Sequence, residues 1–353
     1  MHSINFRDKI TTMKAGIYYS NNDVRIQEMP APKIGKGELL VRVHASGICG
    51  SDVMEWYRAH KVPLVLGHEI GAEIIDVGAG LPRPYKKGQR ITAAHHVPCE
   101  KCHFCKMGHP TTCETLRKTN FDPGGFAEYV RLPAINVRYG VFALPENVSY
   151  EEATFIEPLA CILRGQRIAG MKKGKGVLII GCGISGCLHI KLAKATGAAC
   201  IVALDVVKYR LDKAKKSGAG LVINAKDYNP DMFRKQNAGL LADIVIVCTG
   251  ALPAISQAID SVERGGTILF FAPTANNTDV TIPFNKLFWR NEITLTSSYA
   301  ASPAEHAEAL KLIASGKIKV KDLITHRLPL DRIGDGFRLV AEARESLKVI
   351  IEP

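Results

Sequence analysis

The feature that most constrains the fold is a glycine-rich turn between a buried strand and a helix. The apolar run Val177–Ile180 is typical of a strand, and a helical pattern follows at 184–195. Gly181, Gly183 and Gly186 form a G-x-G-x-x-G arrangement that follows the strand and extends into the start of the helix. The first glycine permits a tight turn, the second lets a pyrophosphate approach the backbone, and the third lets the helix pack on the strand. The turn therefore predicts a dinucleotide site, in preference to a glycine turn without a ligand.

An acidic residue follows at the distance that such a site requires. Asp205 closes the next predicted strand, nineteen residues beyond Gly186. Its carboxylate would accept hydrogen bonds from the adenosine ribose hydroxyls and repel a 2′-phosphate, which favours NAD over NADP. Arg210 comes five residues later. Because an arginine near this position can accommodate a 2′-phosphate, NADP stays open as the less favoured choice.

Strands and helices alternate along the central part of the chain. The predicted strands there are 177–180, 200–204, 221–223, 244–248, 267–271 and 293–297. A helix is expected at Lys208–Ser217, ending at Gly218. This alternation predicts an α/β domain, a doubly wound parallel sheet with helices on both faces.

The sequence before this region has a different pattern of residue types. Short β-branched runs separated by Gly and Pro predict an irregular β domain. Ser149 and Glu152 form a capping-box pattern that opens a helix, and Pro158 is expected as the first residue of the next helix. A chain of 353 residues is long enough for two domains. We expect the α/β domain to be 158–298 and the β domain to comprise 1–157 and 299–353.

Four of the ten cysteines lie within fifteen positions, in the lobe 99–113. Their spacing is Cys99-x2-Cys102-x2-Cys105-x7-Cys113. Thiolates at such spacing can close a tetrahedron around Zn²⁺, and four protein ligands leave no open position, which is typical of a structural site. Four buried apolar cysteines are a poor alternative, because the residues between them are polar. The lobe therefore predicts one structural zinc ion.

A second set of metal-ligand residue types is scattered along the chain. Cys49, His68 and either Glu69 or Glu157 could supply a thiolate, an imidazole and a carboxylate, which leaves a fourth position for water or substrate, as in catalytic zinc sites. Asp52 could orient the ring of His68. Each residue alone is weak evidence, since a lone Cys or His is more often a packing residue. Together with the glycine turn and the cysteine lobe, they predict a catalytic zinc ion.

These motifs resemble the zinc-containing medium-chain dehydrogenase/reductase superfamily, nearer its sorbitol and threonine dehydrogenase branch than its liver alcohol dehydrogenase branch. The resemblance extends from about Met13 to the end of the chain. The matching motifs are GICGSD at 47–52, GHE at 67–69, the four-cysteine lobe, GGFAEY at 124–129, IEPLAC at 156–161, GCGISG at 181–186 and THR at 325–327. The resemblance implies a GroES-like β domain completed by the C-terminal tail, with a Rossmann domain inserted between.

Roles for individual residues follow from the same resemblance. Cys49 and His68 would bind the catalytic zinc, with Glu69 and Glu157 as carboxylates that alternate with water in the remaining coordination. Ser51 would pass the alcohol proton outward. The positions that would contact NAD are Gly181, Gly183, Ile184, Gly186, Asp205, Arg210, Thr249, Ala272 and Ser298.

One departure from the superfamily concerns the proton path. Where relatives often have a histidine three residues after the relay Ser or Thr, this chain has Met54, which cannot carry protons. The proton would therefore leave Ser51 through water or another group such as Glu55. Trp56 and Tyr57 are expected to line the substrate pocket, although aromatic residues more often serve packing.

The expected function is hydride transfer between a secondary alcohol and NAD, assisted by zinc, in a cleft between the domains. Polyols, cyclitols, diols and hydroxy amino acids all remain possible substrates. The competing hypotheses are a zinc-free NADPH-dependent enone or quinone reductase of the same superfamily, and a non-catalytic protein that binds zinc and a nucleotide.

Composition excludes several other classes of protein. The net charge is +12, but the basic residues form no long run, which argues against nucleic acid as a partner. No apolar stretch is long enough to span a membrane, and no secretory signal opens the chain. We therefore expect a cytoplasmic protein with a small-molecule substrate. By resemblance, a homodimer or homotetramer is expected.

Overall fold

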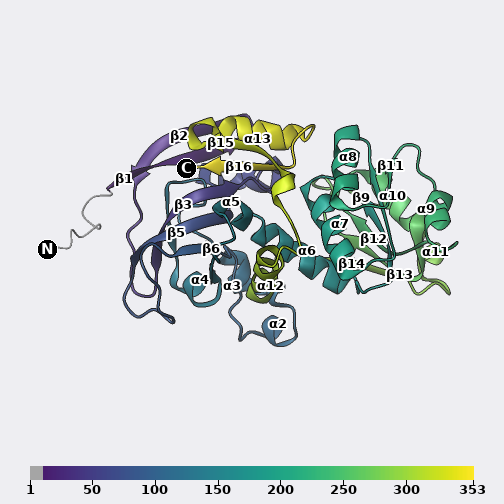
Figure 1. Ribbon diagram of the computed structural model, residues 1–353, viewed down its shortest axis with the longest axis horizontal. Coiled ribbons are helices and arrows are strands. Elements are labelled where there is room, and N and C mark those ends of the chain that lie inside the picture. Colours follow the sequence, from purple (N-terminus) through teal and green to yellow (C-terminus); the bar gives the residue numbers. More distant parts are fainter. Residues whose placement is uncertain (1–10) are drawn as a thin grey trace. The chain divides into compact units, whose positions relative to one another are not determined.

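The computed structural model describes residues 11–353, which fall into two compact units (Figure 1). One unit runs up to Ala160 and resumes at Ala300–Pro353, and the other is Cys161–Tyr299. Within the described range, no helix has both the length and the apolar character needed to cross a bilayer.

Two β-sheets form the first unit. The larger has seven strands in the order β15-β16-β3-β5-β6-β8, with β7 paired to β3, and the smaller has the order β2-β1-β4. The strands are β1 (Thr12–Ser20), β2 (Asp23–Pro30), β3 (Leu39–Gly47), β4 (Leu64–Val65), β5 (Glu69–Val77), β6 (Arg90–Ala93), β7 (Tyr129–Leu132), β8 (Val141–Ala143), β15 (Ile324–Pro329) and β16 (Lys348–Glu352). Because β16 pairs antiparallel to β3, with Ile350 opposite Gly47, the end of the chain lies beside the segment that leads to Cys49.

Helices connect and cover these sheets. They are α1 (Glu55–Arg58), α2 (His103–Lys106), α3 (Glu114–Lys118), α4 (Ala134–Tyr139), α5 (Tyr150–Ala153), α6 (Ile156–Ile168), α12 (Pro303–Ala314) and α13 (Ile333–Glu342). The capping box that opens α5 is confirmed, because the side chains of Ser149 and Glu152 each accept a hydrogen bond from the other residue's amide, at 3.2 and 3.0 Å.

The predicted position of Pro158 in its helix is wrong by two residues. Helix α6 begins at Ile156, so that Pro158 lies inside the first turn and not at its first position. The first four N–H groups of a helix have no intrahelical acceptor, and a proline is therefore tolerated at more than one position of that turn. The residue type alone does not locate the start of the helix.

A parallel six-stranded sheet forms the second unit, in the order β11-β10-β9-β12-β13-β14. Its strands are β9 (Gly176–Ile180), β10 (Cys200–Asp205), β11 (Leu221–Asn224), β12 (Ala242–Val247), β13 (Val262–Phe270) and β14 (Thr294–Ser297). Its helices are α7 (Ile184–Thr196), α8 (Lys208–Ser217), α9 (Pro230–Gln236), α10 (Leu252–Ser261) and α11 (Phe284–Phe288). The helix predicted at Lys208–Ser217 is confirmed, and Gly218 ends it with a φ of +117°.

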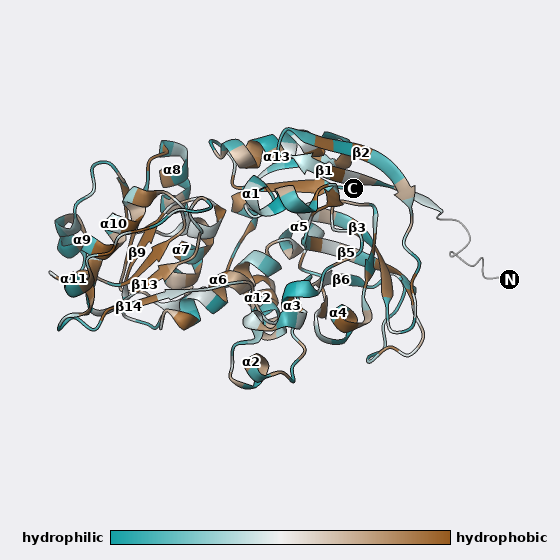
Figure 2. Ribbon diagram, turned by 180° about the vertical axis from the view of Figure 1, so that it is seen from behind, coloured by the Kyte–Doolittle hydropathy of each residue, from teal (hydrophilic) through white to brown (hydrophobic). Residues whose placement is uncertain are grey.

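Both faces of this sheet are buried. Along β9, Leu178 and Ile180 belong to one hydrophobic cluster, whereas Val177 and Ile179 belong to another. Successive side chains of a strand point to opposite faces, so the two clusters lie on the two sides of the sheet. Figure 2 accordingly shows the inner strands of this sheet mostly in brown. The predicted doubly wound α/β architecture is confirmed.

Candidate active site

The ends of two paired strands bring three metal-ligand side chains together. Cys49 follows β3, His68 immediately precedes β5, and Glu69 is the first residue of β5, paired with Gly47 of β3. The ligand atoms of Cys49, His68 and Glu69 all lie within 4.8 Å of one another. A thiolate, an imidazole and a carboxylate so placed fit Zn²⁺ with one position left for a further ligand.

Asp52 is buried behind His68. Its Oδ1 lies 3.4 Å from Nδ1 of His68, as the sequence predicted, and its Oδ2 accepts a hydrogen bond of 3.1 Å from the Cys49 amide. Burial raises the pKa of Asp52, but His68 and Arg58 outweigh it and lower the pKa below its ordinary value. The carboxylate therefore stays ionised and holds the ring of His68 through Nδ1, which leaves Nε2 for a metal.

Lys348, on the last strand, forms a buried ion pair with Glu69. Its ammonium also lies 5.3 Å from the centre of the Phe155 ring. A side chain at Gly47 would collide with both charged groups, so that only glycine leaves room for the pair. Burial raises the pKa of Glu69, and Lys348 opposes that effect. Because Lys348 binds one carboxylate oxygen, the other is the oxygen left for a metal.

Glu157, on α6, belongs to a different group of side chains. Its carboxylate and the ring nitrogens of His68 and His95 lie within 4.8 Å of one another. Among residues 11–353, the groups Cys49–His68–Glu69 and His68–His95–Glu157 have only His68 in common. The four residues predicted to surround the catalytic zinc are thus divided, with Cys49 and Glu69 in one group and Glu157 in the other.

Arg58 contacts the predicted relay residue Ser51. Its Nη2 lies 3.4 Å from the Ser51 hydroxyl and 3.4 Å from Asp52, and its Nε donates to the Ser51 carbonyl at 3.1 Å. Glu55, suggested as an alternative proton acceptor, accepts the Asn21 amide at 2.8 Å. A guanidinium donates hydrogen bonds but accepts none. Arg58 can therefore orient Ser51 but cannot take its proton.

The two aromatic residues expected in the substrate pocket, Trp56 and Tyr57, immediately precede Arg58. Trp56 is 45% exposed. The ring of Tyr57 contacts two cations, with the Arg58 guanidinium 4.7 Å and the Lys61 ammonium 4.7 Å from its centre. Tyr57 thus supports the side chain of Arg58.

In the second unit, the glycine-rich turn has the three properties predicted for it. Gly181 has a φ of +96°, in the region that favours glycine. A Cβ at Gly186 would collide with the Gly181 carbonyl, which shows how closely the helix approaches the strand. At Gly183 a Cβ would meet nothing within 4 Å. The turn therefore leaves open space where a pyrophosphate would approach the backbone at the start of α7.

Asp205, at the end of β10, lies beside this turn. Its carboxylate accepts the amides of Cys182 at 2.7 Å and Val207 at 2.9 Å. The guanidinium of Arg210 lies 3.9 Å away. A carboxylate has about four lone-pair sites. Acceptor capacity thus remains for ribose hydroxyls.

The other predicted cofactor residues lie at the same edge of the sheet. Ile184 begins α7 directly after the glycine turn, whereas Thr249, Ala272 and Ser298 follow β12, β13 and β14. Carboxyl ends of parallel strands meet at one edge, and ligands of open α/β sheets bind there. The predicted residues thus surround the place where this kind of sheet binds nucleotides.

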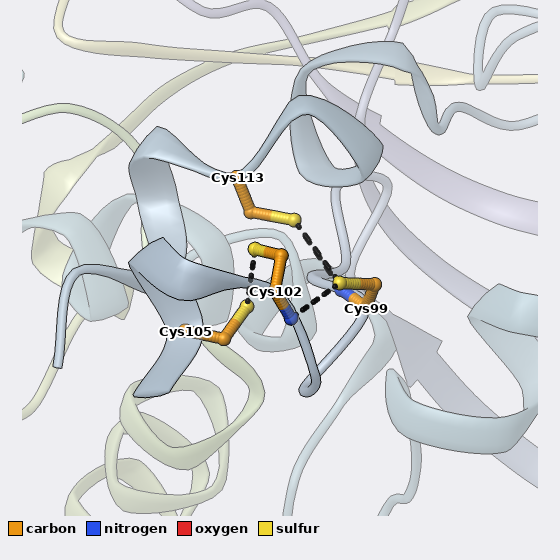
Figure 3. Close-up of side chains that lie close together, drawn as sticks. All are labelled: Cys99, Cys102, Cys105 and Cys113. Carbon is orange, nitrogen blue, oxygen red and sulfur yellow. Dashed lines mark hydrogen bonds between the residues drawn. The ribbon is translucent and has the colours of Figure 1, made fainter. Parts of the chain in front are cut away.

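The four lobe cysteines converge on one point (Figure 3). The Sγ atoms of Cys102 and Cys105 are 3.5 Å apart, and those of Cys99 and Cys113 are 3.6 Å apart. Ligands of a tetrahedral Zn–S₄ site are separated by about 3.8 Å. Burial raises the pKa of Cys113, but amide hydrogen bonds from Cys99 and Leu116 lower it to about 6. The lobe is thus shaped to hold thiolates around a zinc ion.

Comparisons with known proteins agree with this geometry. The family model for the Alcohol dehydrogenase GroES-like domain matches residues 35–145, and the model for Zinc-binding dehydrogenase matches residues 185–315. The sorbitol dehydrogenase of Bos taurus is 31% identical over 347 residues, which cover 95% of each chain. The chain belongs to the zinc-dependent medium-chain dehydrogenases. The resemblance to the sorbitol dehydrogenase branch is confirmed.

Solved structures of two other dehydrogenases share the whole fold. A zinc-binding dehydrogenase chain of Sinorhizobium meliloti, bound to NADP, superposes with a TM-score of 0.85 at 28% identity, over 97% of this chain and 99% of that chain. A protein of Escherichia coli described as a short chain alcohol dehydrogenase, complexed with NADH, gives a TM-score of 0.86 at 26% identity, over 97% of this chain and 100% of that chain.

Family membership identifies the chemistry in general terms. This medium-chain dehydrogenase is a zinc-dependent alcohol oxidoreductase that uses a nicotinamide cofactor. The zinc-free reductase and the non-catalytic binder, considered from sequence alone, are therefore set aside.

Sequence reasoning missed three residues of this dehydrogenase site. Lys348 lies 279 positions from Glu69, and no local pattern connects them. Arg58 stands four residues after Met54, outside the motif that drew attention to Ser51. His95 did leave a signal, because two adjacent histidines directly before the cysteine lobe are unusual in an otherwise apolar strand end.

Proposed function

We propose that this dehydrogenase oxidises secondary alcohols that carry neighbouring hydroxyl groups, such as polyols and diols, with NAD as the preferred acceptor. The observation that carries the proposal is the convergence of Cys49, His68 and Glu69 at the paired ends of β3 and β5, with Asp52 behind the imidazole. The sorbitol dehydrogenase relationship supports the polyol substrate class.

Each side chain of the site has a distinct task in this proposal. Cys49, His68 and Glu69 hold the catalytic zinc, and Glu157 serves as the carboxylate that alternates with water beside it. A bound zinc ion would supply Lewis acidity at the alcohol oxygen, and a bound nicotinamide would supply the acceptor for the hydride. Asp52 fixes the His68 ring through Nδ1, which sets the direction of the coordinating nitrogen.

Ser51 receives the proton of the alcohol in this scheme. Arg58 donates to the Ser51 oxygen at 3.4 Å, which leaves the second lone pair of that oxygen for the substrate. Neither Met54 nor Arg58 can accept the proton in turn. We therefore infer that water carries the proton from Ser51 to the solvent.

The preference for NAD rests on Asp205. Its carboxylate is 6% exposed, keeps acceptor capacity, and would repel the 2′-phosphate of NADP. Arg210 opposes this preference, because a guanidinium at this position can pair with a 2′-phosphate. The ion-pair distance of 3.9 Å between the two residues supports NAD, because Asp205 balances that positive charge.

We also propose the domain and assembly assignments that the sequence suggested. The GroES-like catalytic domain is 1–157 with 299–353, it carries the structural zinc in the lobe 99–113, and the NAD-binding domain is 158–298. The superfamily resemblance suggests a homodimer or homotetramer, and the expected cytoplasmic location is part of the same proposal. A sedimentation measurement on the purified protein tests the assembly.

The function is tested by a substrate screen. Polyols, cyclitols, diols and β-hydroxy amino acids are each offered with NAD and with NADP, and reduced nicotinamide is followed by its absorbance. We expect NAD reduction by polyols or diols, lost on zinc removal and in Cys49→Ser and Glu157→Ala. Full activity of Cys49→Ser, or reduction of enones with NADPH without any alcohol oxidation, would contradict the proposal.

A further inference from the structure

Two imidazoles beside Glu157 have no task in the proposed chemistry. His95 follows β6, and its ring centre lies 4.6 Å from that of His68. His306 lies on α12 and is 3% exposed. Glu157 is an electrostatic neighbour of His306, and His306 is one of His95. Three polar side chains from separate parts of the chain, His68, His95 and Glu157, therefore lie together beside the proposed zinc site, and His306 is near enough to interact with two of them electrostatically.

Each of these two imidazoles has a buried ring nitrogen without a hydrogen-bond partner. The unpartnered atom is Nδ1 in His95 and Nε2 in His306. The other ring nitrogen of His306, Nδ1, lies 2.9 Å from the Ser302 carbonyl oxygen. Buried polar atoms in native proteins nearly always have partners. Unpartnered nitrogens here indicate that a ligand supplies the missing hydrogen bonds.

The geometry argues against His95 as one of the zinc ligands. Its ligand atom is grouped with those of His68 and Glu157, whereas Cys49 and Glu69 form their own group with His68. Glu157, the carboxylate proposed to alternate with water beside the zinc, belongs to the same group as His95. A ligand at that open position would therefore lie on the side of His68 where His95 is found.

We propose that His95, with Glu157 and His306 beside it, binds a second hydroxyl of the substrate, on the carbon next to the one that is oxidised. This inference rests on the proposed function and names the residue that selects its substrate class. A neutral imidazole offers one donor and one acceptor, as a hydroxyl does, so the two can pair in either direction. Simple alcohols leave the nitrogen of His95 unpaired, and the site disfavours them for that reason.

The test compares two alcohols that differ by one hydroxyl, butane-2,3-diol and butan-2-ol. A site built to pair a hydroxyl can reject the analogue that lacks it by factors far above ten. We expect native kcat/KM to favour the diol by at least about tenfold. His95→Phe removes the pairing group but keeps a planar ring, and it should lower this ratio by roughly tenfold or more, mainly through a higher KM for the diol.

A neighbouring imidazole provides the matched control. Nδ1 of His96 lies 2.6 Å from the Thr119 carbonyl, so this ring already has a partner within the protein. His96→Phe should keep the diol preference within about threefold of native. His95→Asn retains a donor and an acceptor and should recover part of the preference that His95→Phe loses.

A binding measurement separates recognition from turnover. Calorimetric titration of the zinc- and NADH-loaded protein with each alcohol proceeds without reaction, and the ratio of dissociation constants should change as the kinetic ratio does. The native ratio decides the matter even where a variant does not fold, because native protein without diol preference overturns the proposal. An unchanged ratio in His95→Phe, or an equal loss in His96→Phe, also overturns it.

The outcomes distinguish this inference from the function on which it rests. If butan-2-ol and the diol are oxidised equally well, the enzyme activity stands and the role of His95 falls. If neither these alcohols nor any polyol reduces the cofactor, the proposed function is wrong. The role of His95 in binding the diol is then tested by calorimetry alone.

Discussion

Lys348 and Glu69 form an ion pair in which both side chains are 1% exposed, and it connects the last strand of the chain to the residue after His68. Removal of one partner from a buried pair leaves a charge without compensation, at a cost of about 3–5 kcal/mol. Lys348→Met should therefore lower the free energy of unfolding by roughly 3 kcal/mol in urea denaturation. The double variant Lys348→Met/Glu69→Gln should recover much of this loss. A loss of stability below about 1 kcal/mol in the single variant would show that the pair is dispensable.

Loss of one lobe cysteine should affect stability more than chemistry. Cys113→Ser removes a ligand from the four-sulfur group, so we expect one zinc fewer per chain and a lower unfolding temperature. Cys200→Ser changes a cysteine that belongs to none of the possible metal-ligand groups, so it is the matched control and should keep the full zinc content. Metal analysis and thermal unfolding of the two variants test this expectation, which fails if Cys113→Ser retains its zinc.

Asp205 should determine the choice between NAD and NADP. Asp205→Ser removes the carboxylate that repels a 2′-phosphate and leaves Arg210 nearby, so the kcat/KM ratio of NAD to NADP should fall by at least about tenfold, or roughly 1.4 kcal/mol. Asp212→Ser changes an exposed aspartate of the adjoining helix and should leave the ratio as it is. Native protein that prefers NADP would refute the assigned role of Asp205.

The buried histidine of α7 should make the protein less stable in mild acid. Burial lowers the pKa of His189 to about 3, and its Nδ1 lies 3.2 Å from the Gln166 amide nitrogen. In the unfolded chain the pKa is about 6.5. Between these two values the unfolded state binds a proton that the native state does not, so the stability present above about pH 6.5 is lost as the pH falls.

The same linkage gives a measurable difference. Between about pH 7 and about pH 5, His189 should account for a loss of up to about 2 kcal/mol in the free energy of unfolding. The leucine of His189→Leu has no titratable group. The loss in its free energy of unfolding between the two pH values, measured by urea denaturation, should therefore be smaller than that of the native protein by up to about 2 kcal/mol. An identical pH dependence in native and variant protein would rule out this contribution of His189.

Local patterns were sufficient to predict the second unit from sequence. The helix pattern at Ile184 and the stop at Gly218 depend on neighbours within a few residues, and the structure places both elements as expected. The glycine turn likewise has a local cause, because each glycine meets a different steric demand of one strand–helix junction.

Long-range contacts limited the prediction of the active site. Motifs located Cys49, His68 and Glu69, but the pairing of Lys348 with Glu69 depends on the register of β16 against β3, which no local pattern specifies. The separation of Glu157 from Cys49 and the unpartnered nitrogens of His95 and His306 are likewise properties of packing. Residue types therefore predicted which chemistry is present, and the fold determined which side chains meet.

Metal analysis of native and Cys49→Ser protein tests the central claim most directly. The four-cysteine lobe and the group Cys49–His68–Glu69 predict two zinc ions per chain in the native protein. The variant should keep the lobe zinc, lose the other ion, and lose alcohol oxidation with it. A native protein that holds a single zinc ion, retained in Cys49→Ser and lost in Cys113→Ser, would contradict zinc-dependent catalysis at this site.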